Sequence, residues 1–254
     1  MSIATALTAL ADDVTAARAA VTAKGGTVTP DGGTSQLADD IGTIPSGGAE
    51  ITDGIVIKSR DANGEATEID IYGTIIYPFT MGASVGDTYG WFGRKVTKAN
   101  LKSEVTEIKT SSGGISPFTF AALEEISVPS TCHKFGGNTF RSLSNLKNVE
   151  IKGSVSFTAN NGNYMFYGNK NTLETVVLGS IGEKITTTRN DVFNGQYPNL
   201  TLTIFTDGSN ADNCLTKFRQ GATNATIIIK ASEDTTYNGV SYAAGDTMIT
   251  SEVA

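Results

Sequence analysis

The pair Cys132-His133 joins two of the most reactive residue types in the chain, and His133 is the only histidine. A thiol and an imidazole can act as nucleophile and general base when the ring reaches the sulfur atom. Adjacent residues of an extended segment point to opposite sides of the backbone, however, which is poor geometry for proton transfer. We therefore expect Cys132 to fill the core beside Phe135, and we predict no catalytic residue here.

The chain offers few candidates for a metal or cofactor site. No second histidine is present to complete a site around Cys132 and His133. The segments "DANGE" (61–65) and "FTDGSNADN" (205–213) imitate calcium loops. The first lacks a twelve-residue pattern that ends in Glu, and the second has Ala211 at its fifth position. We interpret both as polar turns. Because phosphate-binding glycine motifs and triad spacings are also absent, we predict no metal, no cofactor and no enzymatic activity.

The composition favours a β-rich protein with a real core. Charged residues make up 18% of the 254 residues, hydrophobic residues 39%, and there are 28 glycines. The formal net charge of −7 argues against a nucleic-acid partner, which would need clustered Lys and Arg. No window is strongly basic, and no run of 18 apolar residues occurs, so we expect no membrane partner and no transmembrane helix.

Most of the candidate residues named above lie within a sequence repeat. Alternating apolar pairs recur 23, 27, 26 and 25 residues apart, at Ile126/Val128, Val149/Ile151, Val176/Leu178, Leu202/Ile204 and Ile227/Ile229. Each pair follows an aromatic residue, in order Phe120, Phe140, Phe166, Phe193 and Phe218. The residue between them is Leu123, Leu146, Leu173, Leu200 and, in the last copy, Ala225. We expect an earlier, degenerate copy at Val105/Ile108, after Leu101.

A period of 20 to 29 residues with one short strand per copy is typical of a leucine-rich-repeat solenoid. One copy cannot bury its own apolar face, so neighbouring copies stack and share one core. We predict that the five pairs form one parallel sheet and that the phenylalanines stack in an inner column. Cys132 and Cys214 would then be about 14 Å apart across three rungs of the sheet, too far for a disulfide.

Residues 1–47 are predicted to form a small helical module. Apolar residues step by four and three along an assembly seam, Ile3, Leu7, Leu10, Val14, Ala17 and Val21. Gly25 and Gly26 end this helix, and a second short helix carries Leu37, Ile41 and Ile44. A helix of this length is marginal alone. It must pack on the short helix, on copies of itself or on a larger assembly.

Two hairpins are expected around the repeats. Alternating segments at 54–60 and 66–72 flank Asn63-Gly64, a strong hairpin signal. A second hairpin turns at Asn238-Gly239, with a further turn at 245–246, and we expect it to cap the last rung. The predicted organisation is therefore a helical module (1–47), a β-hairpin and connector (48–78), a solenoid (79–230) and a hairpin cap (231–254).

The segment "FAALEEISVPSTCHKF" resembles the bacterial surface-antigen (BspA-like) class of leucine-rich repeats, in which an aromatic residue precedes "L-x-x-V-x-I-P". The resemblance covers roughly residues 100 to 230. The stretch "AAVTAKGGTVTPDGGTSQLADDIGTIPSGG" is similar to leader segments of structural proteins from phages of Gram-positive bacteria. An Asn-Gly hairpin that leads into such repeats is similar to phage tail and fibre-like proteins.

This resemblance implies a phage virion surface protein that forms a homo-oligomer. The N-terminal module would bind other virion proteins, and the repeats would adhere to a host-surface glycan or protein as part of a tail fibre. One alternative is a capsid decoration or head-fibre protein, and another is a bacterial cell-surface repeat adhesin. The N-terminus is unlike a secretory signal, so we expect synthesis in the bacterial cytoplasm and a final location on the particle surface.

The predicted binding face consists of the residues that alternate with the buried pairs. These are Glu125, Ser127, Asn148, Glu150, Thr175, Val177, Thr201, Thr203, Thr226 and Ile228. The face is polar and lacks aromatic hot-spot residues, so a solvated sheet without a ligand is an equal alternative. Loop aromatics are the second candidate surface, namely Trp91, Tyr164 and Tyr167.

Overall fold

The computed structural model describes residues 14–15, 17–19, 21, 54–76, 95–110, 117–118 and 122–251. The chain divides into two compact units, residues 1–51 and 52–254. In the first unit, the described residues are helical, with Val21 buried and Val14 and Ala17 half-buried. The other three residues of the assembly seam, Ile3, Leu7 and Leu10, lie outside the described residues.

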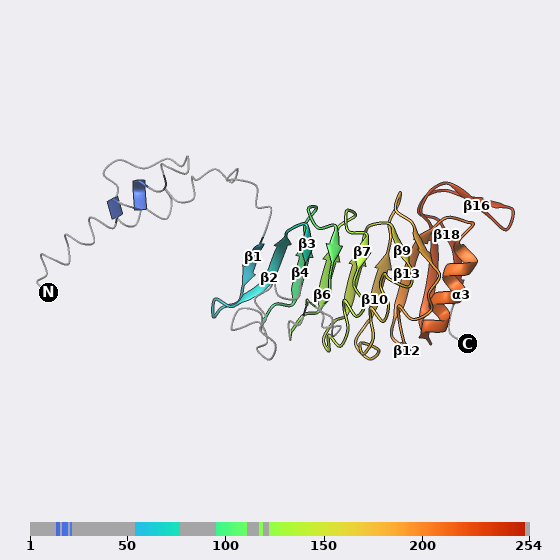
Figure 1. Cartoon of the computed structure of the whole chain (residues 1–254), viewed down its shortest axis with the longest axis horizontal. Coiled ribbons are helices and arrows are strands. Elements are labelled where there is room, and N and C mark those ends of the chain that lie inside the picture. Colours follow the sequence, from blue (N-terminus) through green and yellow to red (C-terminus); the bar gives the residue numbers. More distant parts are fainter. Residues whose placement is uncertain are drawn as a thin grey trace, which may run out of the picture. The chain divides into compact units, whose positions relative to one another are not determined.

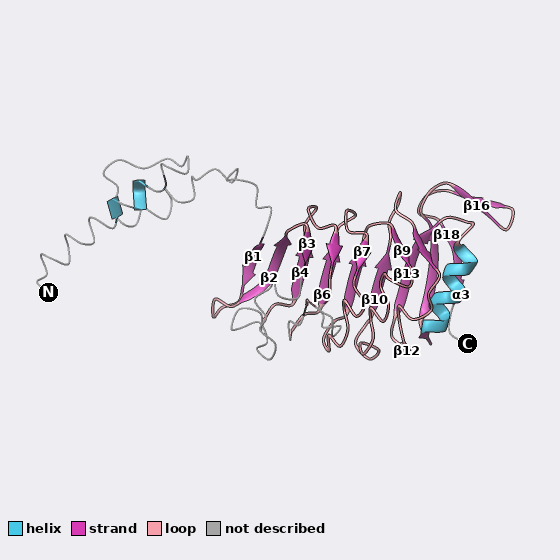
Figure 2. Ribbon diagram, viewed as in Figure 1, coloured by secondary structure: helices cyan, strands magenta, loops and turns pink. Residues whose placement is uncertain are grey.

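The second unit is a β-solenoid of about five turns, and its largest element is a nine-stranded sheet, here called the main sheet. Figures 1 and 2 show its strands side by side along the unit. In spatial order they are β1 (Gly54–Arg60), β2 (Ala66–Tyr72), β4 (Lys98–Leu101), β6 (Glu125–Val128), β8 (Asn148–Ile151), β10 (Thr175–Leu178), β13 (Thr201–Thr206), β15 (Thr226–Ala231) and β18 (Thr247–Ser251).

The main sheet is parallel from β2 to β15, so the predicted parallel arrangement of the five apolar pairs is confirmed. Only its two outermost strands run antiparallel, β1 against β2 and β18 against β15. The predicted first hairpin is β1–β2, and it turns at Gly64, where φ is +82°. Its second strand is also the first parallel strand of the solenoid.

Shorter parallel ladders form the other sides of the coils. One contains β3 (Ile75–Ile76), β5 (Glu107–Ile108) and β7 (Lys134–Phe135). A second pairs β9 (Val155–Phe157) with β11 (Ile185–Thr187), and a third pairs β12 (Gly195–Gln196) with β14 (Ala222–Thr223). Each coil thus hydrogen-bonds to its neighbours along more than one side, which satisfies backbone groups that the core would otherwise leave unpaired.

The register of the main sheet explains the spacing of the repeat. Val149 lies opposite Ile126 on one side and opposite Val176 on the other, and the second members of the pairs align in the same way. Successive residues of a strand point to opposite faces, so all five pairs enter one interior. Their side chains are at most 2% exposed.

The phenylalanine column is confirmed. Phe140 and Phe166 stack with ring centroids 5.4 Å apart, and Phe166 stacks on Phe193 at 4.6 Å. Phe218 continues the column with a T-shaped contact to Phe193 at 6.2 Å. At the other end the structure places Phe118 on Phe140, at 5.6 Å. The expected first member, Phe120, lies outside the described residues.

Polar side chains inside the solenoid tie neighbouring coils together. The amide of Asn169 donates to the carbonyl of Phe140 (2.5 Å) and accepts the N–H of Leu143 (2.9 Å), although Asn169 is only 1% exposed. The hydroxyl of Tyr197 donates to the carbonyl of Phe166 at 2.9 Å. Both polar groups are therefore satisfied within the core.

The expectation of a degenerate copy at Val105/Ile108 was wrong in its register. The main-sheet strand of that copy is β4, in which Ala99 and Leu101 point inward. Val105 and Ile108 are also buried, but Ile108 lies on β5, in the shorter ladder. Ala99 is small and gives only a weak apolar signal. The more apolar pair Val105/Ile108, which follows β4, was therefore assigned to the strand in its place.

The last coil departs from the one before it. There, β11 follows the main-sheet strand β10, whereas in the last coil the helix α3 (Ala211–Gly221) follows the main-sheet strand β13. The buried residues of α3 are Ala211, Cys214, Phe218 and Gly221, with spacings of three and four that suit one face of a helix. Residues 205–213, interpreted as a polar loop, therefore contain the beginning of a helix. Phe218, the largest buried residue of α3, had been assigned to the repeat, which hid the helical spacing.

The C-terminal segment contains the predicted hairpin, β16 (Thr235–Tyr237) with β17 (Val240–Tyr242). Asn238 and Gly239 have φ values of +50° and +79°, as a two-residue hairpin turn requires. The hairpin contacts α3 through the Tyr237 hydroxyl, which donates to Asp212 at 2.7 Å. The strand that covers β15, however, is β18. The last rung is thus closed by a separate antiparallel strand that follows the hairpin.

Candidate functional site

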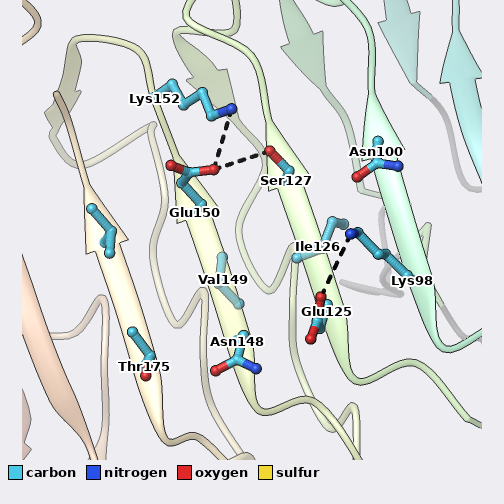
Figure 3. Close-up of a pocket in the computed structure, with 11 residues that line it drawn as sticks. Lys98, Asn100, Glu125, Ile126, Ser127, Asn148, Val149, Glu150, Lys152 and Thr175 are labelled. Carbon is cyan, nitrogen blue, oxygen red and sulfur yellow. Dashed lines mark hydrogen bonds and ion pairs between the residues drawn. The ribbon is translucent and has the colours of Figure 1, made fainter.

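An open groove runs across the outward face of the main sheet (Figure 3). It has a volume of about 430 Å³. Its lining comes from β4, β6, β8 and β10 and from Lys152 just beyond β8: Lys98, Asn100, Glu125, Ile126, Ser127, Asn148, Val149, Glu150, Lys152, Thr175 and Val177. The groove therefore brings together six of the predicted binding-face residues, Glu125, Ser127, Asn148, Glu150, Thr175 and Val177.

The charges in the groove compensate one another across neighbouring strands. Lys98 lies 3.9 Å from both Glu68 on β2 and Glu125 on β6. Glu150 accepts a hydrogen bond from Ser127 (3.3 Å) and pairs with Lys152 (3.3 Å), as Figure 3 shows. These side chains are a third to a half exposed. The pairs therefore add little stability, and their polar atoms are accessible to a ligand.

The outward face changes character toward the C-terminus. In the first outward position, Glu68, Lys98 and Glu125 are followed by Asn148, Thr175, Thr201 and Thr226 in register. In the second position, Glu150 is followed by Val177, Thr203 and Ile228. The predicted residues Thr201 and Thr203 thus extend the groove face onto a surface of mainly β-branched side chains. Beyond them on the same face, Lys230 lies 5.9 Å from the centroid of the Phe205 ring.

The loop aromatics lie elsewhere. Tyr164 and Tyr167 come from the segment between β9 and β10, and their rings meet edge to face at a centroid distance of 6.4 Å. They are 39% and 42% exposed, whereas Phe166 between them is fully buried, as expected. The structure therefore separates them from the groove residues, which are on strands. The third predicted aromatic, Trp91, lies outside the described residues.

Cys132 and His133 point to different environments. The Cys132 side chain is fully buried, and its thiol donates to the carbonyl of Lys134 at 3.9 Å. His133 is exposed, and its Nδ1 lies 2.8 Å from the carbonyl oxygen of Ser154. Burial raises the pKa of the Cys132 thiol to about 12, so the nucleophilic thiolate is scarce at neutral pH. This geometry offers no nucleophile and base pair.

Both cysteines are free and buried, as the repeat spacing predicts. Burial also raises the pKa of Cys214 to about 12. Within the described part of the chain, no cluster of three or more His, Cys, Asp or Glu residues is placed to hold a metal ion. No helix among the same residues is long and apolar enough to cross a membrane.

The second segment that imitates a calcium loop, residues 205–213, forms a turn organised by Asp207. Burial alone would raise the pKa of Asp207, but hydrogen bonds from Ser209, Lys184 and Asn210 outweigh it and hold the pKa at about 2. The Lys184 ammonium lies 2.9 Å from this carboxylate, whose side chain is 12% exposed. The carboxylate therefore fixes the turn that leads into α3, and its acceptor sites are occupied by protein donors.

Comparisons with protein-family models, with curated proteins and with solved structures find no match for this chain. The features that bear on function are therefore the groove, the loop aromatics and the two-unit organisation. Sequence reasoning missed Lys98, Asn100 and Lys152 as groove residues. Lys98 and Asn100 belong to the copy whose register was misassigned, and Lys152 follows its strand.

Proposed function

We propose that this chain is a phage virion surface protein whose BspA-like repeat solenoid is displayed for adhesion to the host surface, as part of a tail fibre or receptor-binding device. In this proposal, the N-terminal unit docks onto other virion proteins. The groove on the main sheet contacts the host ligand, which is a glycan or a protein.

The observation that carries the proposal is the in-register outward face of the main sheet. A parallel β-solenoid holds its outward side chains at a fixed spacing of about 4.8 Å from strand to strand, so the face is rigid before any ligand arrives. A rigid face loses little conformational freedom on binding. The groove also presents carboxylates, ammonium groups and amides together, which suits a polar surface ligand.

The division of the chain supports a separate attachment function. Residues 52–254 form a compact unit with one continuous core, and residues 1–51 form another unit. Attachment and recognition can therefore be altered independently. The described seam residues Val14, Ala17 and Val21 are helical, as a docking seam would require, and Val14 and Ala17 are only half-buried.

The decisive experiment deletes residues 1–47 from the chain in the parent phage. We expect the remaining solenoid to stay folded and soluble but to be lost from purified particles. Val14→Asp should give the same loss because it would bury an unpaired charge in the docking seam. Particles that carry the truncated chain at normal copy number would contradict the proposal.

The adhesive part has its own test, in which purified chain competes with particles for host cells. Glu150→Lys should abolish the competition because it reverses a charge at the centre of the groove. The matched control is Glu233→Lys, which changes a 60% exposed carboxylate outside the groove. Equal competition by both variants would exclude the groove as the contact surface.

A further inference from the structure

A second surface, formed by loops, brings one cation and two exposed aromatic rings together. Arg141 lies between β7 and β8, and Tyr164 and Tyr167 lie in the corresponding segment of the next coil. The guanidinium carbon of Arg141 is 4.9 Å from the centroid of the Tyr167 ring. The two tyrosine rings are nearly perpendicular, with an interplanar angle of 84°. We call these three residues the Tyr-Arg cluster.

The backbone beneath the cluster is held by bonds between coils. The N–H of Ser142 donates to the carbonyl of Tyr167 at 2.9 Å, and the N–H of Tyr164 donates to the carbonyl of Asp191 at 2.8 Å. Tyr164 and Ser142 have φ values of +49° and +56°. Such left-handed conformations are costly for residues other than glycine, and they concentrate at functional sites. The cluster is therefore positioned before a ligand binds.

Arg141 is a cation without a carboxylate partner within the described residues. Its contacts are the Tyr167 ring and the side-chain oxygen of Asn138, at 3.4 Å. Several other cations of the solenoid, such as Lys98 and Lys184, are paired with carboxylates. The guanidinium group can bind an anion through two parallel hydrogen bonds, and stacking on the aromatic ring fixes its orientation.

The tyrosines add two further recognition elements. Each ring offers a flat apolar face next to a hydroxyl group, and both side chains are more than a third exposed. A pyranose ring has a matching face of C–H groups and a rim of hydroxyls. An extended peptide fits less well, because it would need free backbone groups, and the N–H groups of Ser142 and Tyr164 already donate to carbonyls of the next coil.

We propose that the Tyr-Arg cluster binds an acidic saccharide. The sugar ring stacks on a tyrosine face, and its carboxylate or phosphate group binds Arg141. The inference rests on the proposed adhesive function and names the ligand class for a surface distinct from the groove. It requires an anion and a sugar ring on the same ligand, so neither a neutral sugar nor a simple anion fulfils it.

The test measures binding to the full chain by calorimetry with tri-galacturonate and with its methyl ester, in which methyl groups remove the negative charges. A second pair, mannose 6-phosphate and mannose, distinguishes phosphate from carboxylate. We expect at least one acidic probe to bind ten-fold or more tightly than its neutral partner. Equal binding within both pairs, or no binding of either acidic probe, would overturn the proposal.

Variants assign the binding to the cluster. Arg141→Gln, Arg141→Lys and Tyr167→Ala should each weaken binding ten-fold or more, since lysine keeps the charge but lacks the planar fork. Tyr167→Phe should retain the stacking and most of the affinity. The control Arg60→Gln removes an exposed arginine on the β1–β2 hairpin and should change nothing.

Two results would contradict the assignment. One is unchanged affinity in Arg141→Gln when circular dichroism shows a folded chain. The other is binding of hexaglutamate as tight as that of tri-galacturonate, which would indicate an acidic-peptide site. Failure of this test leaves the particle-incorporation experiment unaffected, so the two proposals can fail separately.

Discussion

The interior and the outward face of the main sheet are made by alternate residues of the same strands, yet they differ in how far they vary from coil to coil. In β10, Val176 and Leu178 point inward and continue a column of aliphatic residues. Thr175 and Val177 point outward. Along the sheet, the residues in register with them change from lysine and glutamate in the first coils to threonine and isoleucine in the last. An inward side chain must fit the coils on both sides at close packing density. An outward side chain meets mainly solvent, so its identity is free to serve binding.

The largest effect is expected when the same substitution, Phe→Ala, is made in the interior and on the outward face of the main sheet. Phe140→Ala and Phe193→Ala should each lower the free energy of unfolding by roughly 3–5 kcal/mol, because each leaves a cavity between stacked coils. Phe205 points outward beside Lys230 and is half-buried, so Phe205→Ala should cost clearly less. Denaturant unfolding monitored by circular dichroism measures all three. Equal losses in the interior and outward variants would remove the distinction.

Asp207 directly follows β13, at the boundary between the interior and the outward face. Its lowered pKa predicts that the free energy of unfolding depends on pH. Its folded pKa of about 2 lies below the ordinary value of 3.8, so its contribution is fully present above about pH 4 and is lost as the pH falls toward 2. The shift corresponds to about 2 kcal/mol of unfolding free energy. Asp207→Asn should flatten this part of the stability profile. A wild-type profile with no loss from pH 4 to pH 2 beyond that of the variant would contradict the assignment.

The smallest effect is expected for charges on the outward face. Glu150→Gln removes the ion pair with Lys152 and weakens the bond from Ser127, yet it should change the unfolding free energy by less than about 1 kcal/mol. Thermal unfolding at low and high salt should show a small difference that shrinks as salt rises. A loss that is as large as in the phenylalanine variants would mean that the groove is a structural element.

The interior was predictable from the sequence, because its constraint repeats in every coil. Apolar pairs and phenylalanines at nearly constant spacing indicate stacked strands without any partner protein. The copy at β4 was misassigned where Ala99 replaced a larger residue, because a small side chain carries little periodic signal. The helix α3 was missed because Phe218, which is buried on its inner face, also fits the repeat.

The site was less predictable than the fold. The outward positions on β6, β8 and β10 follow directly from alternation, and they do line the groove. Lys98 and Arg141 could not be found in this way, because their roles depend on which residues become neighbours when coils stack. The contact of Arg141 with Tyr167, 26 residues further along the chain, exists only once the coil length is known.

The two antiparallel edges, β1 and β18, have a consequence for how this molecule can change over evolutionary time. All strands between them are related by the same step, so a duplicated or deleted copy of a whole coil leaves both edge pairings as they are. Each such event would lengthen or shorten the sheet by about 4.8 Å. Insertion or removal of whole coils would therefore change the length of the main sheet in fixed increments and leave the two ends as they are.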